Sequence, residues 1–306
     1  GDVNGDGATD VVQVRFNDID VWFNQAGEGF TERVTVSTPA APGFSPNVRF
    51  ADIDGSGTTD VIYGNAGRWQ YVDLAGGQRA RLLEEVRNGL GASTHLTYGS
   101  SADDYLADLR DADGGAYETF DWSKLAGGCD HILSSNTTPG ATTEESGACV
   151  YRSGGSPVVS TVVRGVETND HFSLVGRPDN VVQTEFAYHD GYYEGIEQEF
   201  RGFGAADAIA RGDGHHPTAI TRTHFRQGRR PTDIASDRLA DNPREALKGR
   251  QWLSEVFDEG GTYLSSSLAT LTVRHLMTGL DGRGIYYGYV SQSDEFRYGT
   301  NGAGVG

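Results

Sequence analysis

The sequence contains an acidic, glycine-rich segment, Asp52-Ile53-Asp54-Gly55-Ser56-Gly57-Thr58-Thr59-Asp60. Oxygen-bearing side chains stand at its first, third, fifth and ninth positions, and glycines stand where the backbone must turn sharply. Ca²⁺ takes about six to eight oxygen ligands, so this spacing is typical of a short loop that wraps a hard cation. Thr58, at the seventh position, would add its backbone carbonyl.

The same pattern opens the chain. Its ligand positions are Asp2, Asn4, Asp6 and Asp10, with Ala8 offering a carbonyl. Asp2 precedes Asp52, and Asp10 precedes Asp60, by the same 50 residues. Two such loops at a fixed offset indicate an internal repeat rather than a chance match. Residues 21–27 and 70–76 also resemble each other, at an offset of 49.

The loops differ from an EF-hand. The twelfth position, which needs a bidentate Glu in an EF-hand, holds Gln13 in one copy and Ile62 in the other. Each loop runs into an apolar, β-branched segment, which predicts a hairpin turn between strands. A period near 50 with several short strands is typical of propeller blades. We therefore expect structural Ca²⁺ in both loops, with Ser56 weakening the second. A metal-free acidic turn of the same shape is the alternative.

Composition limits the function classes. The chain has 306 residues, a formal net charge of −18 and a pI near 4.7. Such a surface repels phosphate backbones and anionic lipid, which disfavours nucleic acid and membrane surfaces as partners. The sequence contains no apolar run long enough to cross a membrane. The 43 glycines predict many turns.

We expect an all-β chain with minor helix, in three parts. Residues 1–78 form propeller-type repeats, residues 79–230 a second region and residues 231–306 a third. Asn88-Gly89 predicts a hairpin. Residues 100–157 are expected to be a long exposed loop or insertion, and residues 196–203 a single alternating strand. One helix is predicted at 243–248, capped by Asp241 or Asn242 and ended by Gly249.

The two cysteines, Cys129 and Cys149, both lie in the expected insertion. In an exported protein they would form a disulfide, worth about 3 kcal/mol by the chain-entropy argument. In a reducing cytosol they would be free thiols. Because neither a C-x-x-C motif nor a histidine at ligand spacing accompanies them, a zinc site is disfavoured.

The sequence gives little support for a catalytic site. His189-Asp190 and Asp170-His171 could form base dyads, but the sequence has no Ser or Cys in a nucleophile-elbow context. Two glutamates, Glu197 and Glu199, share one side of the expected strand with Arg201, which would neutralise them. We therefore predict no catalytic residue and no enzymatic activity.

Several longer stretches resemble one family. The sharpest is Tyr188-His189-Asp190-Gly191-Tyr192-Tyr193-Glu194-Gly195, which runs into Glu199-Phe200-Arg201-Gly202-Phe203-Gly204. Residues 88–98, 157–170, 223–225 and 245–250 fit the same pattern. These stretches are similar to the B component of the ABC-type insecticidal toxin complexes, the Tc toxins. The similar region is the end of an FG-GAP/VCBS-type propeller and the middle/N-terminal and middle/C-terminal regions. Gln198 departs from it, since members usually have Arg there.

The resemblance implies a structural role. In that family the B component and an RHS-type C component build a hollow shell of antiparallel β-sheet around a toxic segment. The propeller docks on the pentameric A component and gates its translocation pore. It also implies a secreted, extracellular protein that is cytoplasmic before release. The alternative is a calcium-binding FG-GAP/RHS adhesion or wall-associated protein.

Overall fold

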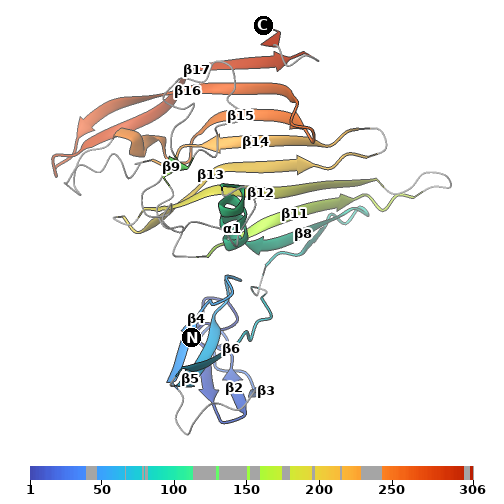
Figure 1. Cartoon of the computed structure of the whole chain (residues 1–306), viewed down its shortest axis with the longest axis vertical. Helices are drawn as coiled ribbons and strands as arrows, with labels where there is room; N and C mark the ends of the chain where they lie inside the picture. Colours follow the sequence, from blue (N-terminus) through green and yellow to red (C-terminus); the bar gives the residue numbers. More distant parts are fainter. Residues whose placement is uncertain are drawn as a thin grey trace. The chain divides into compact units, whose positions relative to one another are not determined.

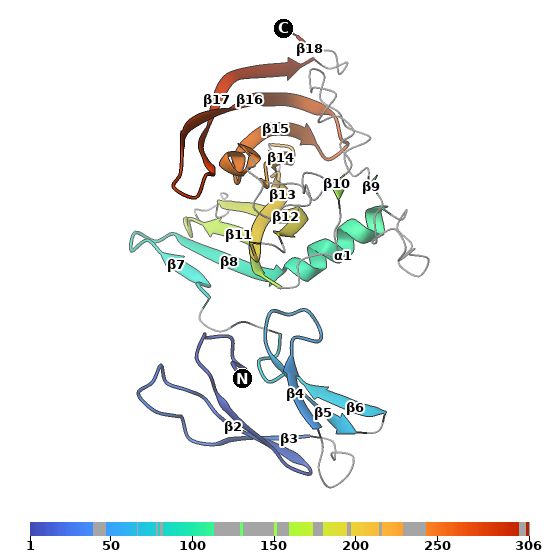
Figure 2. The same ribbon diagram turned by 90° about the vertical axis from the view of Figure 1, so that its left-hand side faces the viewer.

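The computed structural model describes residues 1–38, 47–65, 67–77, 79, 82–112, 129–130, 150–151, 159–173, 180–194, 197–213, 216–228, 243–299 and 304–305. In this part of the chain the regular structure is mostly antiparallel β-sheet with little helix, as predicted (Figures 1 and 2). The chain forms two compact units. The N-terminal unit comprises Gly1–Glu84, Tyr98–Asp103 and Val159–Val162, and the sheet unit comprises the remainder.

The N-terminal unit contains two three-stranded antiparallel sheets. The first is β1 (Val11–Val14), β2 (Asp18–Trp22) and β3 (Val34–Ser37); the second is β4 (Asn47–Ala51), β5 (Asp60–Asn65) and β6 (Arg68–Val72). Their shared core is made of fully buried apolar side chains, namely Val3, Ile19, Val21, Val61 and Tyr63. Each contributes roughly 1.5–3 kcal/mol relative to exposure. Because residues of both repeats enter this core, each sheet stabilises the other.

The second acidic loop joins β4 to β5, and Ala51 pairs with Asp60 across its base. The prediction of a hairpin turn between strands is therefore confirmed for this loop. The first loop has the same base, because the Asp10 N–H donates to the Gly1 carbonyl at 2.7 Å.

The sheet unit is built on a ten-stranded sheet in the order β18-β17-β16-β15-β14-β13-β12-β11-β8-β7 (Figure 1). Its neighbours from β11 to β18 pair antiparallel. The strands are β7 (Glu85–Arg87), β8 (Ser93–Ser100), β11 (Thr161–Asn169), β12 (Val181–Glu194), β13 (Glu199–Ala210), β14 (Ala219–Phe225), β15 (Gln251–Asp258), β16 (Tyr263–Thr278), β17 (Gly284–Tyr298) and β18 (Gly304–Val305). A separate pair, β9 (Cys129–Asp130) and β10 (Val150–Tyr151), lies between β8 and β11 in sequence. The predicted Asn88-Gly89 hairpin joins β7 to β8.

The expectation of an exposed loop from residue 100 is wrong at its start. Ser101–Ala112 forms the helix α1. The Ser100 hydroxyl accepts the Ala102 N–H at 3.1 Å, as a helix N-cap does. Most of the remaining segment to residue 157 lies outside the described residues.

The single strand expected at 196–203 is also wrong. β12 ends at Glu194, which pairs with Glu199 at the start of β13, and Glu197 and Gln198 form a turn just before β13. Gln198 has φ +55°, a left-handed conformation that is uncommon for a residue other than glycine and is typical of turns. Glu197 therefore lies in the turn, whereas Glu199 and Arg201 lie on β13.

The predicted helix at 243–248 is present as a 3-10 helix, η4 (Pro243–Leu247). Gly249 follows with φ +72°, as expected for the residue that ends it. Its predicted caps, Asp241 and Asn242, lie outside the described residues.

Candidate metal loops and buried charged row

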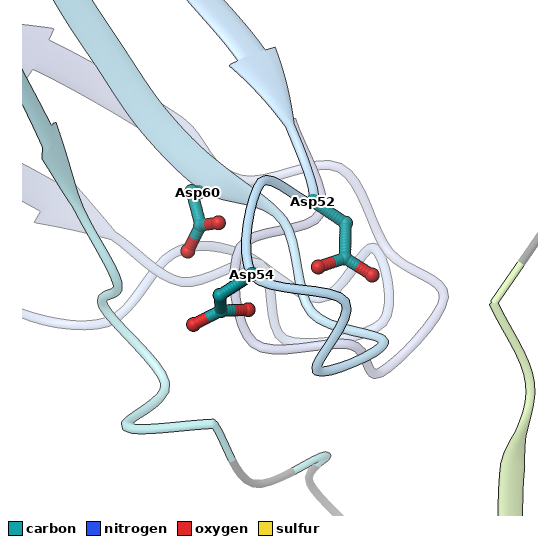
Figure 3. Close-up of side chains that lie close together, drawn as sticks. All are labelled: Asp52, Asp54 and Asp60. Atoms are coloured by element: carbon teal, nitrogen blue, oxygen red, sulfur yellow. The ribbon is translucent and has the colours of Figure 1, made fainter. Parts of the chain in front are cut away.

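The second loop brings three carboxylates together (Figure 3). Asp52, Asp54 and Asp60 each offer an oxygen, and these atoms lie within 4.8 Å of one another. Local backbone geometry places them: Gly55 and Gly57 have φ of +74° and +85°, which fold the chain back on itself. Within the described residues this is the one such group of three acidic side chains.

Backbone amides hold these carboxylates in position. Asp52 accepts the N–H groups of Ser56 at 3.0 Å and Gly57 at 2.8 Å. Asp54 also accepts the Ser56 N–H, at 3.0 Å. Asp60 Oδ2 accepts the Ile53 N–H at 2.8 Å. The side chains of Ser56 and Thr58 lie 2.8 Å apart. The loop is thus a set of acceptors facing inward on a fixed backbone.

The first loop repeats this hydrogen-bond pattern. Asp2 accepts the N–H groups of Asp6 at 3.1 Å and Gly7 at 2.9 Å, and Asn4 accepts that of Asp6 at 3.0 Å. Asp10 Oδ2 accepts the Val3 N–H at 3.0 Å. Residue for residue, these bonds match those of the second loop at an offset of 50, which confirms the repeat. Ala8 donates its N–H to Asp6 Oδ1 at 2.8 Å.

The loops differ at their ninth position. Asp10 Oδ1 accepts the Asn24 N–H at 2.9 Å. Asp60 is buried, as Asp10 is, but its Oδ1 atom has no hydrogen-bond partner in the described part of the chain. Burial raises the pKa of Asp60, the Ile53 N–H opposes this, and the nearby charges of Asp54, Asp73 and Asp52 raise it further. A cation would satisfy that oxygen and offset the repulsion, so the donor set of the second loop fits Ca²⁺.

A second polar cluster lies on the large sheet, where sequence analysis had not placed one. Asp207, Arg222, Glu255 and Ser266 are opposite one another on β13, β14, β15 and β16. Arg222 donates to both Asp207 oxygens, at 2.7 and 2.6 Å. Although burial opposes its ionisation, the hydrogen bonds from Arg222 and His189 lower the pKa of Asp207 to about 2. We call these four residues the charged row.

The charged row continues into neighbouring side chains. His224 Nε2 lies 2.9 Å from Glu255 Oε2, and both side chains are buried. Burial and the Glu255 charge raise the pKa of Tyr263. Removing one partner of a buried ion pair leaves the other charge uncompensated, so these pairs tie neighbouring strands to one register. This arrangement is that of a structural ion network.

The two histidines considered as bases contact residues that are distant in sequence. The ring nitrogens of His189 contact Asp108 Oδ1 at 2.7 Å and Asp207 Oδ2 at 3.4 Å. Asp170 accepts the N–H groups of Phe172 and Asn180. His171 Nε2 lies 2.6 Å from Ser93 Oγ. Asp108, expected in an exposed loop, is 6% exposed.

Arg201 is almost fully buried and pairs with Glu245 at 2.5 Å and Glu199 at 3.3 Å. Of the two glutamates that Arg201 was predicted to neutralise, Glu199 pairs with it, whereas Glu197 lies in the turn before β13. The two cysteines predicted as disulfide candidates are not described at the side-chain level. Cys149 and the side chain of Cys129 lie outside the described residues.

Of the described helices, none has the length and apolar character to span a membrane.

Comparison with known proteins places this architecture in one family. The model of the family described as "Insecticide toxin TcdB middle/N-terminal region" matches residues 23–233, well over half of the chain. A comparison with curated proteins gives no match.

Three solved structures share the fold. The crystal structure of TcdB2-TccC3-Cdc42 is 21% identical with a TM-score of 0.70, and the match covers 97% of this chain and 14% of that one. The crystal structure of TcdB2-TccC3 is 22% identical with a TM-score of 0.69, covering 97% and 15%. The Photorhabdus luminescens Tc holotoxin pore is 21% identical with a TM-score of 0.70, covering 97% and 14%. The chain thus spans 14–15% of the length of these solved chains. It belongs to the insecticide toxin TcdB middle/N-terminal region family.

Proposed function

We propose that this chain is a non-enzymatic structural segment of the B component of a Tc-type toxin complex. The sheet unit is part of the wall of the RHS-type shell, and the N-terminal unit is the end of its propeller. The protein acts as a secreted assembly and encloses a cargo segment rather than converting a substrate.

The observation that carries this proposal is the ten-stranded antiparallel sheet, whose fold matches TcdB2 chains solved in complex with TccC3 over 97% of this chain. Its buried charges support a structural role. Both ring nitrogens of His189 are engaged by carboxylates, and Asp207 is held by Arg222. Groups fixed in this way hold strands together and are poorly placed to accept a proton from a substrate.

Co-purification tests the proposal. The full-length protein is co-expressed with an RHS-type C component, and either partner is captured by a tag on the other. We expect one stable complex that survives gel filtration, because the two chains would close one sheet system. An unrelated acidic β-rich protein of similar size serves as the control bait. Separate elution of the two components would contradict the proposal.

We also propose that the N-terminal unit takes part in docking on the pentameric A component, as part of the gate to its pore. The support is the repeat of two hairpin-borne loops at an offset of 50 residues, with a core shared between repeats. Binding of the full-length protein to the A component, measured with and without the C component, tests this role independently of shell assembly. A B component that binds the C component but not the A component would contradict docking alone.

The acidic loops are proposed to bind Ca²⁺ as structural ions. The ligands of the second loop would be Asp52, Asp54, Ser56, Asp60 and the Thr58 carbonyl; those of the first would be Asp2, Asn4, Asp6, Asp10 and the Ala8 carbonyl. The buried Asp60 Oδ1 atom without a hydrogen-bond partner is the main support for the second site. Bound Ca²⁺ would fix the hairpin turns against the shared apolar core.

A further inference from the structure

The pairing of β12 with β11 covers the five residues from Val181 to Glu185, and nine further residues of β12 follow, from Phe186 to Glu194. The register between the two strands runs from Asn169 opposite Val181 to Gly165 opposite Glu185. On its other side, β12 stays paired with β13 as far as Glu194. A row of backbone donors at an open strand edge is a template for pairing with another strand, so such an edge needs a cover.

Two aspartates of α1 provide that cover. Asp104 Oδ1 accepts the N–H of Tyr188 at 3.1 Å, and Asp108 Oδ2 accepts the N–H of Asp190 at 3.0 Å. Both aspartates are 6% exposed. Four residues of helix rise about 6 Å and two residues of strand advance about 6.6 Å, so the two acceptors match the two donors. The helix presents acceptors at nearly the repeat that a neighbouring strand would.

Charged side chains close the same contact. His189 lies between the two donors in sequence, and its ring reaches Asp108 of α1 at 2.7 Å and Asp207 of β13 at 3.4 Å. Behind it, Arg222 of β14 holds Asp207 at 2.6 Å. One helical turn away, Arg164 of β11 pairs with Asp104 at 2.5 Å. His189 is thus the cation that joins a helix carboxylate to a sheet carboxylate.

We propose that α1 is a pH-sensitive clasp on the edge of β12, that His189 fastens it, and that its release uncovers the amides of Tyr188 and Asp190. Two carboxylates contact the His189 ring, Asp108 from α1 and Asp207 from β13. While the ring carries its proton it attracts both. Once the proton leaves, at most one ring nitrogen donates, and two buried negative charges remain across a neutral group.

The direction of the pH effect follows from His189. Although burial opposes its charge, the hydrogen bonds to Asp108 and Asp207 raise the pKa of His189 to about 10. A raised pKa in the folded state means that the contribution is complete below the ordinary value of about 6.5 and is lost as the pH rises through about 10. The clasp is therefore closed at neutral pH and opens in alkali.

Hydrogen exchange read by mass spectrometry on the full-length protein tests the clasp. At pH 7 we expect His189→Gln, which keeps a neutral hydrogen-bonding side chain, to lower protection of peptides covering 104–112 and 186–192 by about tenfold or more. Peptides from β14 and β15 should keep their protection. His216→Gln is the matched control, because His216 is an exposed histidine beside Asp213.

A pH series makes the test independent of whether the variant folds. In the wild-type protein, protection of 186–192, corrected for the intrinsic exchange rate, should fall between about pH 9 and pH 11, around the His189 pKa of about 10. The β14 and β15 peptides should not follow it. Unchanged protection of 186–192 across that range would overturn the proposal. So would a loss spread equally over the sheet, because it would mean that His189 only supports the fold.

Discussion

Asp60 is the residue at which the two acidic loops differ most in hydrogen bonding. Its side chain is fully buried, one oxygen is held by the Ile53 N–H, and the other has no hydrogen-bond partner among the described residues. A buried carboxylate oxygen left unsatisfied costs about 1–3 kcal/mol or more, so such a group is retained where something else satisfies it. Its counterpart Asp10 uses the same oxygen to accept the Asn24 N–H.

We predict that Asp60→Asn removes calcium binding by the second loop. In the wild-type protein, Ca²⁺ at about 100 times its Kd should stabilise the N-terminal unit by about 3 kcal/mol and raise its Tm. The variant should lose the part of that shift due to the second loop. Without Ca²⁺ it should be no less stable than the wild type, because one buried charge is gone. Calorimetric titration and thermal melts measure both effects.

Glu28→Gln is the matched control, since Glu28 is an exposed acid of the same unit. It should leave both the heat of binding and the calcium-dependent Tm unchanged. If the wild-type protein gives no heat and no Tm change with Ca²⁺, the metal-free acidic turn is the correct interpretation of these loops.

At the scale of elements, the packing of η4 on β17 depends on one glycine. A Cβ atom added at Gly288 would lie 2.4 Å from the Ala246 carbonyl oxygen and 2.9 Å from Leu247 Cδ2. The 3-10 helix is also held by the ion pair between Arg201 and Glu245 and by Lys248, which donates to Glu199 at 2.8 Å. It therefore cannot shift away without breaking these contacts.

Gly288→Ala should accordingly destabilise the sheet unit by about 1–3 kcal/mol, the usual cost of overpacking. Urea denaturation measures the change. Ser293→Ala, at an exposed position of the same strand, is the control and should change stability by no more than about 0.5 kcal/mol. Equal stability of the two variants would show that η4 is not seated on β17 as described.

The elements also show what local sequence can and cannot predict. The acidic loops were predictable because their ligand spacing, glycines and following apolar strands lie within about a dozen residues. The β12–β13 turn was missed because the alternation of residues 196–203 mimics a strand, while the left-handed Gln198 has no glycine to mark it. The capping residues around η4 predict a helix, but they do not show that it is a 3-10 helix.

α1 was missed for a different reason. A run of aspartates in the sequence favours an exposed loop, whereas Asp104 and Asp108 are buried through contacts with residues more than 80 positions away. The available local signal was their four-residue spacing after Ser100-Ser101, a pattern of helix starts. The charged row was equally hidden, since each of its four members comes from a different strand.

At the scale of the whole molecule, acid should weaken the sheet unit through Asp207. A folded-state pKa of about 2, below the ordinary value of about 3.8, means that its contribution is present above pH 3.8 and is lost as the pH falls through about 2. The difference corresponds to about 2 kcal/mol. Asp207→Asn should lose this part of the pH dependence and be less stable than the wild type at pH 7.

Urea denaturation at pH 7, 4 and 2.5 checks this prediction. Asp281→Asn, a change at an exposed turn, is the control and should retain the wild-type dependence. A variant at Asp207 that follows the wild-type curve at every pH would show that the charged row does not couple folding to this carboxylate.

The central claim is that this chain is part of the wall of a closed shell. Electron microscopy of the full-length protein assembled with an RHS-type C component tests it most directly. We predict a hollow particle in which the sheet from β11 to β18 forms part of a continuous wall around internal density. A particle without an enclosed space, or one in which this sheet lies outside the wall, would contradict the account.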